Sequence, residues 1–204
     1  MAKRRAADKA PTIKRVVPRK NNVSLKEAKE QVGIALTRAA LLHLAFSRTL
    51  LDEFGEERGR ELVVRAIMEY GRRVGDRIKR GLPDLPKYGV IEREELRPGG
   101  DKSYDNYKAY DCVFAKTFKE YGELPIGSLY CYVDAAKSMA VDPSQKLIHR
   151  ECAACGDDCC TFEVLPTTEQ ERIDFMYKQS RWKQVDPRLA EGVRQRDSTR
   201  RTSS

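Results

Sequence analysis

The chain has 204 residues, of which 40% are hydrophobic, and its formal net charge is +8. This length fits one domain with tails, and the apolar fraction is large enough for a core. The chain has no run of eighteen consecutive apolar residues and no apolar segment typical of a signal peptide, so we expect no membrane contact and a cytoplasmic location, where thiols stay reduced.

The positive charge is concentrated at the two ends of the chain. Residues 1–21 carry eight Lys or Arg and one Asp, and residues 181–204 carry seven Lys or Arg and three acidic residues. We interpret 1–21 as a disordered basic tail, 22–166 as a single domain, and 167–204 as a C-terminal helix followed by a second disordered tail. The sequence contains no recognised nucleic-acid-binding motif, so we expect no specific nucleic-acid partner.

A long helix is predicted at the start of the domain. Ser24 followed by Glu27 has the pattern of a capping box, and the helix should run from there to about Phe54, where Gly55 ends it. Residues 39–46 are apolar on nearly all sides of this helix. We therefore expect the helix to be deeply buried, in the core or in the interface of a homo-oligomer.

A second helix is predicted over residues 57–80. Its apolar stripe contains Gly71 and Gly75. A glycine inside a helix costs about 1 kcal/mol relative to alanine. The sequence therefore predicts the close approach of another backbone, or of a ligand, at these two positions.

A proline-rich loop follows, and the remaining elements are shorter. They are a strand in 104–113, a helix in 115–121, a helix over 126–140 that begins after Pro125, two strands at 146–153 and 160–165 that form a hairpin, and a last helix over 169–183. The predicted fold class is α+β, with two long N-terminal helices packed with a small, mostly antiparallel sheet that carries short helices on one face.

Four of the six cysteines lie in the predicted hairpin. Cys152 and Cys155 have the spacing of half a zinc knuckle, but their only neighbours in sequence are Cys159 and Cys160. Adjacent residues of a strand point to opposite faces, so one hairpin brings all four sulfurs to one ion only with difficulty. We therefore expect no metal and no other cofactor. The same parity predicts that Cys160 points inward and Cys159 outward.

Two small polar residues mark a candidate site on the helix predicted after Pro125. Cys131 and Asp134 lie off its apolar face and are three residues apart, so they are neighbours on the helix surface. Gly127 and Ser138 lie on the same face. This face has room for a small polar ligand, although an ordinary solvated face has the same composition.

The remaining candidates carry weaker signals. Cys112 lies where a strand leads into a helix, and a position near a helix N-terminus lowers the pKa of a thiol. Cys112 or Cys131 could also complete a metal site, but their spacing gives no support. His43 is a candidate base, although its apolar helix stripe favours a core histidine. His149 and Glu151 share a strand face without any further signal.

Taken together, these segments resemble the L-2-amino-thiazoline-4-carboxylic acid hydrolase family from about Ser24 to Leu165. The segments that carry the resemblance are GEERGRELVVRAIMEYGRRVG at 55–75, Tyr110 to Ala115, Lys119 to Gly122, Gly127 to Asp134, and Gly156 to Phe162. The resemblance implies a small-molecule substrate, 2-aminothiazoline-4-carboxylate. Its cyclic amidine-like ring would be opened by hydrolysis of a carbon–nitrogen bond to give a carbamyl-cysteine.

The resemblance also selects site residues. It points to Cys112, Cys131, Asp134 and Cys160, and it leaves out the remaining cysteines of the hairpin. A thiolate or an activated water would attack the C2 carbon, with Cys131 or Cys112 as the expected nucleophile, and Asp134 would hold the amidine or move protons. The candidate substrate-binding residues are Cys160, Gly127, Ser138 and His43.

Two other classes of function fit part of the sequence. The hairpin pattern of Glu151, Cys152, Gly156, Cys160 and Phe162 is also similar to the terminal hairpin of V4R (4-vinyl reductase) domains, which bind small molecules and are often sensory. Under that alternative the chain binds a ligand without catalysis. A third possibility is a structural protein that interacts through its basic tails. A deep pocket lined by the Cys131 face would argue against it.

Overall fold

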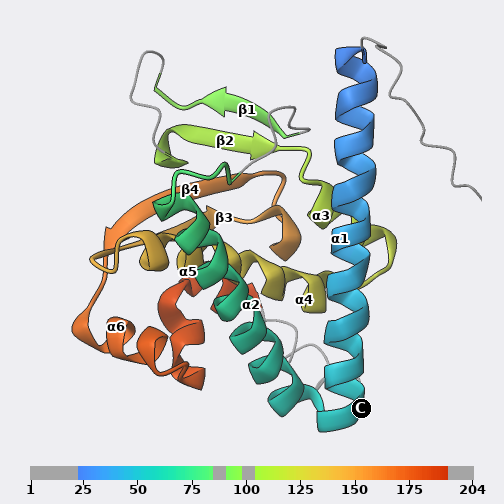
Figure 1. Cartoon of the computed structure of the whole chain (residues 1–204). Helices are drawn as coiled ribbons and strands as arrows, with labels where there is room; N and C mark the ends of the chain where they lie inside the picture. Colours follow the sequence, from blue (N-terminus) through green and yellow to red (C-terminus); the bar gives the residue numbers. More distant parts are fainter. Residues whose placement is uncertain (1–22, 85–90, 98–103, 193–204) are drawn as a thin grey trace, which may run out of the picture.

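The computed structural model describes residues 23–84, 91–97 and 104–192 (Figure 1). The predicted basic tail 1–21 and the end of the predicted C-terminal tail lie outside the described residues. The fold is α+β, as predicted, with a four-stranded sheet beside two long helices and several short ones.

Helix α1 spans Leu25–Phe54, and the Ser24 side chain caps it by accepting a hydrogen bond from the backbone N–H of Glu27. Deep burial in the core of the single chain is wrong, because Phe46 is 66% exposed and Leu42 is 59% exposed. Burial in the interface of a homo-oligomer stays a prediction. The helix buries one narrow stripe and leaves much of its apolar surface outside. The buried stripe consists of Ala40, Leu44, Ser47 and Leu51.

Among the described residues, α1 is long and apolar enough to cross a membrane when judged by length and composition alone. Of its most apolar window, 22% is buried inside the fold. Core helices of soluble proteins and signal sequences pass the same test, so the finding is weak evidence. The expectation of no membrane contact stays a prediction.

Helix α2 spans Glu56–Lys79 and packs along helix α5, Tyr132–Val141. Two of the three glycines of α2, Gly71 and Gly75, lie at this contact. A Cβ atom added to Gly71 would be 2.4 Å from the Cβ of Ala136, and one added to Gly75 would be 2.6 Å from the nearest α5 side chain. The predicted close approach of another backbone is therefore confirmed, and it fixes the position of α5.

The helix predicted over 126–140 is broken into pieces. After α3 (Val113–Glu120) come α4 (Leu124–Gly127), a 3₁₀ turn (Ser128–Cys131) and then α5. Gly127 packs against the ring of Phe118, where an added Cβ would be 2.2 Å from the ring. The break separates the α4 backbone, which lies against α3, from α5, which lies against the sheet.

The sheet has the strand order β1-β2-β4-β3, and all neighbouring strands are antiparallel. The strands are β1 (Glu92–Glu95), β2 (Tyr107–Tyr110), β3 (Gln145–Glu151) and β4 (Cys160–Pro166). Strands β3 and β4 form the predicted hairpin. The sequence does not indicate β1, because all four of its residues are charged and exposed. Charged side chains are typical of an edge strand, where they oppose further pairing.

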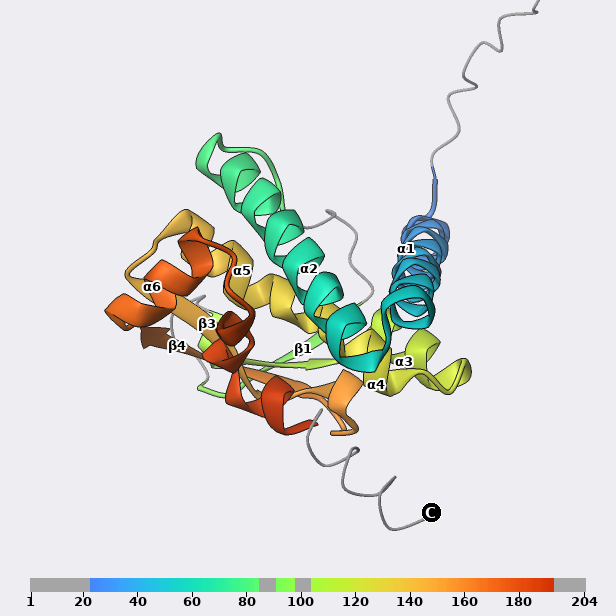
Figure 2. The same cartoon turned by 90° about the horizontal axis from the view of Figure 1, so that it is seen from below.

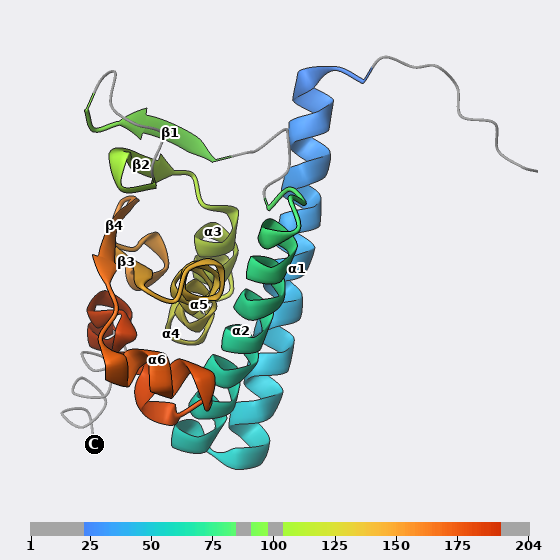
Figure 3. The ribbon, with the colours of Figure 1, turned by 60° about the vertical axis from the view of Figure 1, so that its left-hand side comes forward.

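Helices lie on one face of the sheet in layers. Figure 3 shows the β3–β4 hairpin, then α3 to α5, and then the pair α1 and α2. Helix α6 (Glu169–Met176) lies on the opposite side of the molecule from α1 (Figure 2). After α6 the chain contributes to the core, because Trp182 and Leu189 are each 1% exposed. The described segment beyond Pro166 therefore completes the core around α5.

Candidate functional site

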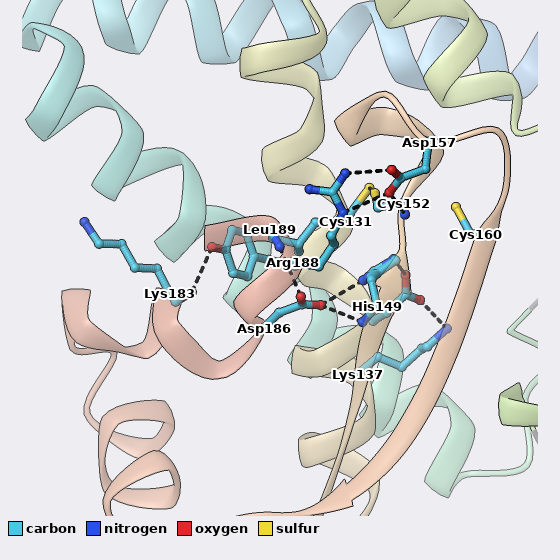
Figure 4. A network of polar contacts seen from close by, with 12 residues as sticks. Cys131, Lys137, His149, Cys152, Asp157, Cys160, Lys183, Asp186, Arg188 and Leu189 are labelled. Carbon is cyan, nitrogen blue, oxygen red and sulfur yellow. Dashed lines mark hydrogen bonds and ion pairs between the residues drawn. The ribbon is translucent and has the colours of Figure 1, made fainter. Parts of the chain in front are cut away.

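A cluster of thiols, an imidazole and carboxylates lies where the start of α5 meets the hairpin (Figure 4). Cys131 ends the 3₁₀ turn before α5, and Asp134 lies in the first turn of that helix. His149 lies on β3, and Cys152 follows the end of that strand. Because β3 packs against α5, the structure adds an imidazole and a thiol to the predicted pair of Cys131 and Asp134.

His149 is held between two carboxylates and is 3% exposed. Its Nδ1 lies 2.8 Å from Oδ2 of Asp186, and its Nε2 lies 3.6 Å from Oδ2 of Asp134. Asp186 is fully buried and also accepts hydrogen bonds from the backbone N–H groups of His149, at 3.0 Å, and Leu189, at 3.2 Å. These bonds fix the plane of the imidazole and direct Nε2 away from Asp186.

Electrostatics favour the protonated form of this imidazole. Burial lowers the pKa of His149, but the hydrogen bond to Asp186 and electrostatic interactions with the Cys131, Asp186 and Asp134 side chains raise it, and the net pKa is about 10. An opposite charge nearby stabilises the charged form of a titratable group. In the absence of any other ligand, His149 is therefore a cation at neutral pH.

The thiols next to it interact with one another. The Cys152 thiol donates to the Cys131 sulfur at 3.7 Å, and hydrogen bonding with Cys131 is the first cause that raises the pKa of Cys152. The pKa of Cys160 is lowered to about 7, first by a hydrogen bond with the Cys152 thiol and also by the backbone N–H of Ala153 and the nearby imidazolium, against the effect of burial. Figure 4 shows the Cys131 and Cys152 sulfurs together and Cys160 to one side.

Asp134 is the carboxylate of the cluster that a ligand can reach, because its side chain is 24% exposed. Its Oδ1 lies 3.3 Å from Nζ of Lys137, which also pairs with Asp84 at 3.0 Å. Cys131 is partly exposed as well. The accessible side of the cluster therefore presents a carboxylate and a sulfur to a small molecule, with the Lys137 ammonium group, on a side chain that is 12% exposed, held between Asp134 and Asp84.

Cys112 occupies the N-cap position of α3. The expectation of a lowered pKa is wrong, because burial raises the pKa of Cys112 to about 12 and outweighs the backbone hydrogen bonds from Phe114 and Ala115. A thiol with this pKa is almost entirely protonated at neutral pH. The structure therefore gives Cys112 no sign of activation as a nucleophile.

His43 lies in the core and not in the cluster. Its ring packs against Phe118 and Tyr130, and Nε2 lies 3.5 Å from the carbonyl oxygen of Ile126. Burial lowers its pKa to about 4, although the hydrogen bond with Ile126 raises it slightly. These contacts favour the interpretation as a neutral core histidine, and a role in substrate binding stays a prediction.

The other predicted residues lie around the cluster. Gly127 is buried against α3, and Ser138 is partly buried one turn after Asp134 on α5. Their roles in substrate binding stay predictions. Cys160 is 7% exposed, in agreement with its predicted inward direction. The predicted outward position of Cys159 is wrong, because Cys159 is 5% exposed; it precedes β4, which begins at Cys160, and its thiol donates to the Glu151 carboxylate at 3.5 Å.

Sequence reasoning misses three site residues, which are Cys152, His149 and Asp186. Cys152, which the family resemblance leaves out, lies at the centre of the cluster. Asp186 comes 37 residues after His149, in a segment for which the sequence predicts a helix and a basic tail. One signal could have found His149. It directly follows Leu147 and Ile148 in a predicted strand, which indicates a buried imidazole that needs a hydrogen-bond partner.

Three residues of the cluster, Cys131, His149 and Cys152, have the arrangement of metal ligands. Cys131, His149 and Cys152 offer ligand atoms that all lie within 4.8 Å of one another. The ligands come from two parts of the fold, and not from the hairpin cysteines alone. This geometry argues against the expectation that no metal binds.

Two hollows of the described structure lie elsewhere. One, with a volume of about 420 Å³, is lined by residues of α2 and the segment 179–190, and the other, of about 540 Å³, lies between α2, α5 and α6. Neither is lined by Cys131 or Asp134. The deep pocket that would exclude a purely structural role is therefore not one of these two hollows.

Comparisons with known proteins give one match. The sequence model of the L-2-amino-thiazoline-4-carboxylic acid hydrolase family matches residues 35–164, a range that includes the whole cluster except Asp186. Among curated proteins and among solved structures, none matches the chain.

Proposed function

The chain belongs to the L-2-amino-thiazoline-4-carboxylic acid hydrolase family, and from this premise we propose that it opens the ring of 2-aminothiazoline-4-carboxylate by hydrolysis at the Cys131–Asp134 face. Hydrolase-like function follows at the level of the family. The choice of substrate and the part played by the thiols are the proposal. The observation that carries it is the partly exposed Asp134 carboxylate beside the thiol cluster, inside the matched range.

The charges of this face suit the two charged groups of the substrate. A protonated amidine is planar and presents N–H donors, which a carboxylate accepts in charge-assisted hydrogen bonds. Asp134 supplies that carboxylate. Lys137 brings a positive charge to the same face, at 3.3 Å from Asp134, and suits the substrate carboxylate. The two side chains are one helical turn apart on α5, so they orient the ring with respect to that helix.

The reaction is the addition of one water molecule to the amidine carbon. The water oxygen bonds to C2, the π electrons of the C2–N double bond move to nitrogen, and a proton passes from the water to the nitrogen. The adduct then opens at one of two ring bonds. Breaking C2–N frees an amine and leaves the carbamyl group on sulfur, whereas breaking C2–S frees a thiol and leaves the carbamyl group on nitrogen. In either case the hydroxyl on C2 becomes a carbonyl and its proton goes to the leaving atom. Asp134 is placed to move the protons.

The proposal uses one of the two thiols that were candidates for the nucleophile. Burial raises the pKa of Cys112 and so disfavours its thiolate, and the proposal therefore does not use Cys112 as the nucleophile. Cys131 is partly exposed and next to Asp134, which is the position from which a thiol can assist attack on C2. We therefore assign thiol assistance to Cys131.

The test is an assay of full-length, reduced protein with L-2-amino-thiazoline-4-carboxylate. Loss of the ring chromophore measures turnover, and reagents for free thiols and free amines identify the bond that breaks. We expect turnover by the wild type and by Cys159→Ala, whose thiol lies outside the cluster, and none by Cys131→Ala. Saturable binding of the thiazoline without turnover would replace this proposal with a ligand-binding function.

A further inference from the structure

We propose that Cys131, Cys152 and His149 bind one divalent transition-metal ion of the zinc type, and that its fourth coordination position holds the water that attacks the substrate. The binding of the ion stands on the geometry of the three residues. The role of the water rests on the proposed ring hydrolysis.

The spacing of the thiols fits a shared ion. A thiolate lies about 2.3 Å from tetrahedral zinc, so two thiolates on one ion are about 3.8 Å apart. The sulfurs of Cys131 and Cys152 are 3.7 Å apart. A ring nitrogen of His149 is the third atom, and all three lie within 4.8 Å of one another. Bringing them onto one ion therefore needs shifts of side chains and not of the backbone.

The orientation of the imidazole is the second observation. Metal-binding histidines usually donate their other ring N–H to a carboxylate, which fixes the ring and makes the free nitrogen a better ligand. Nδ1 of His149 lies 2.8 Å from the fully buried Asp186 carboxylate, so Nε2 is the ring nitrogen that we assign to the ion. Two backbone N–H groups hold Asp186 in turn.

The turn that carries Cys152 is also held in place. Oδ2 of Asp157 accepts a hydrogen bond from the backbone N–H of Cys152 at 2.7 Å, and Arg188 donates to both oxygens of Asp157 at 2.8 Å (Figure 4). Arg188 and Asp186 belong to the same segment after α6. This segment therefore supports both the imidazole and the thiol, as expected for ligands that are positioned before an ion binds.

The ligand set selects the kind of ion. Two thiolates and an imidazole suit zinc and similar soft or borderline cations, and they do not suit calcium or magnesium, which prefer oxygen ligands. Three protein ligands leave one position open, which is the pattern of catalytic zinc sites and not of structural ones. Cys160 contacts the Cys152 thiol but lies outside the group of three.

Asp134 lies where a base for the fourth ligand is needed. Its Oδ2 is 3.6 Å from Nε2 of His149, close to the ion but outside the three ligand atoms. A water bound to the ion transfers a proton to Asp134, and the resulting hydroxide oxygen bonds to C2 of the amidine. Asp134 then returns the proton to the ring atom that leaves. The same division of work, a zinc held by His and Cys with a carboxylate that moves protons, serves the hydrolysis of amidine carbons in nucleobase deaminases.

The first test measures binding without any activity. Full-length, reduced protein is freed of metal by a chelator and titrated with Co²⁺, whose thiolate complexes absorb in the near ultraviolet. We expect a spectrum of tetrahedral cobalt with thiolate charge-transfer bands that saturates at one ion per chain, and displacement of the cobalt by Zn²⁺. A wild-type protein that gives no thiolate band, or that binds no zinc in the presence of a weak chelator, would overturn the proposal.

Variants then locate the ion. Cys131→Ser, Cys152→Ser and His149→Gln should lose stoichiometric binding, while Cys159→Ser should keep it. Asp186→Asn should weaken binding by about 10- to 100-fold, because it removes the acceptor that orients His149. Circular dichroism identifies any variant that fails to fold, and the wild-type titration decides the question if one does. Full binding by folded Cys152→Ser would contradict the assigned ligands.

The two proposals fail in different ways. Zinc binding by the wild type without ring opening leaves the metal site standing and removes the proposed substrate. Ring opening at an equal rate by metal-free and zinc-loaded protein leaves the hydrolase standing and removes the activated water.

Discussion

The contact between α2 and α5 gives a prediction whose size follows from the structure. A methyl group at Gly71 would place its carbon 2.4 Å from the Cβ of Ala136, 3.1 Å from the carbonyl carbon of Ala136, and 3.0 Å from the backbone nitrogen of Lys137. Carbon atoms in contact normally lie about 3.5 to 4.0 Å apart. In Gly71→Ala the two helices must therefore move apart by about 1 Å, since a methyl group has no rotamer that avoids the clash.

The net effect is a difference between two opposing contributions. Overpacking of a core costs about 1 to 3 kcal/mol, and we take the upper end because backbone atoms are involved. Alanine regains about 1 kcal/mol over glycine inside a helix. We expect Gly71→Ala to lower the free energy of unfolding by about 2 kcal/mol, measured by denaturant titration of the full-length protein at neutral pH.

The matched control removes the methyl group on the other helix. Ala136→Gly should be destabilising alone, but combined with Gly71→Ala it should cost less than the sum of the two changes, by about 1 kcal/mol. The relief is partial, because the contact with the Lys137 backbone remains. A Gly71→Ala protein at least as stable as the wild type, or strictly additive effects in the double variant, would refute the reasoning.

Three further predictions concern His43, Trp182 and Cys112. Burial lowers the folded-state pKa of His43 from 6.5 to about 4, so below pH 6.5 the unfolded chain takes up a proton that the folded chain does not. The contribution of His43 to stability should therefore be complete above pH 6.5 and fall by up to about 3 kcal/mol towards pH 4. Denaturant titrations at both pH values should show a smaller loss in His43→Gln than in the wild type, and an equal loss in the two proteins would contradict this. Trp182→Ala should lower the free energy of unfolding by about 3 to 5 kcal/mol, since Trp182 is 1% exposed and donates to the Met139 sulfur at 3.4 Å. Met176→Ala, at a position that is 62% exposed, should change the free energy of unfolding by less than about 0.5 kcal/mol. Similar denaturation midpoints for the two variants would argue against the C-terminal segment as part of the core. Cys112→Ala should keep most of the thiazoline turnover, and loss of turnover in a folded variant would return the nucleophile to Cys112.

Local patterns predict the features that depend on neighbouring residues. The extent of α2, the close contact at Gly71 and the β3–β4 hairpin are visible in the sequence, because helix period, glycine placement and turn residues act over short distances. The same is true of Cys131 and Asp134, which one helical turn brings together. Cys131 and Asp134 are the part of the site that lies within one short stretch of the chain.

Features that depend on tertiary contacts are not visible in the same way. Residues 39–46 are apolar on nearly all sides, so their pattern cannot tell which stripe of α1 the rest of the fold covers, and Phe46 lies on the uncovered side. The partners of His149 come from α5 and from the segment after α6. Only the packing of these elements shows that Cys152 and Asp186 belong to the site.

The central claim is that Asp134 and its neighbours carry out the hydrolysis of the thiazoline ring. The most direct measurement compares initial rates of ring opening by wild-type and Asp134→Asn proteins, full-length, reduced and supplied with Zn²⁺. A carboxylate that moves protons in the rate-limiting step contributes about 10²- to 10⁴-fold, and we predict a loss of this size with the zinc content unchanged. Ring opening by Asp134→Asn at the wild-type rate would contradict the account.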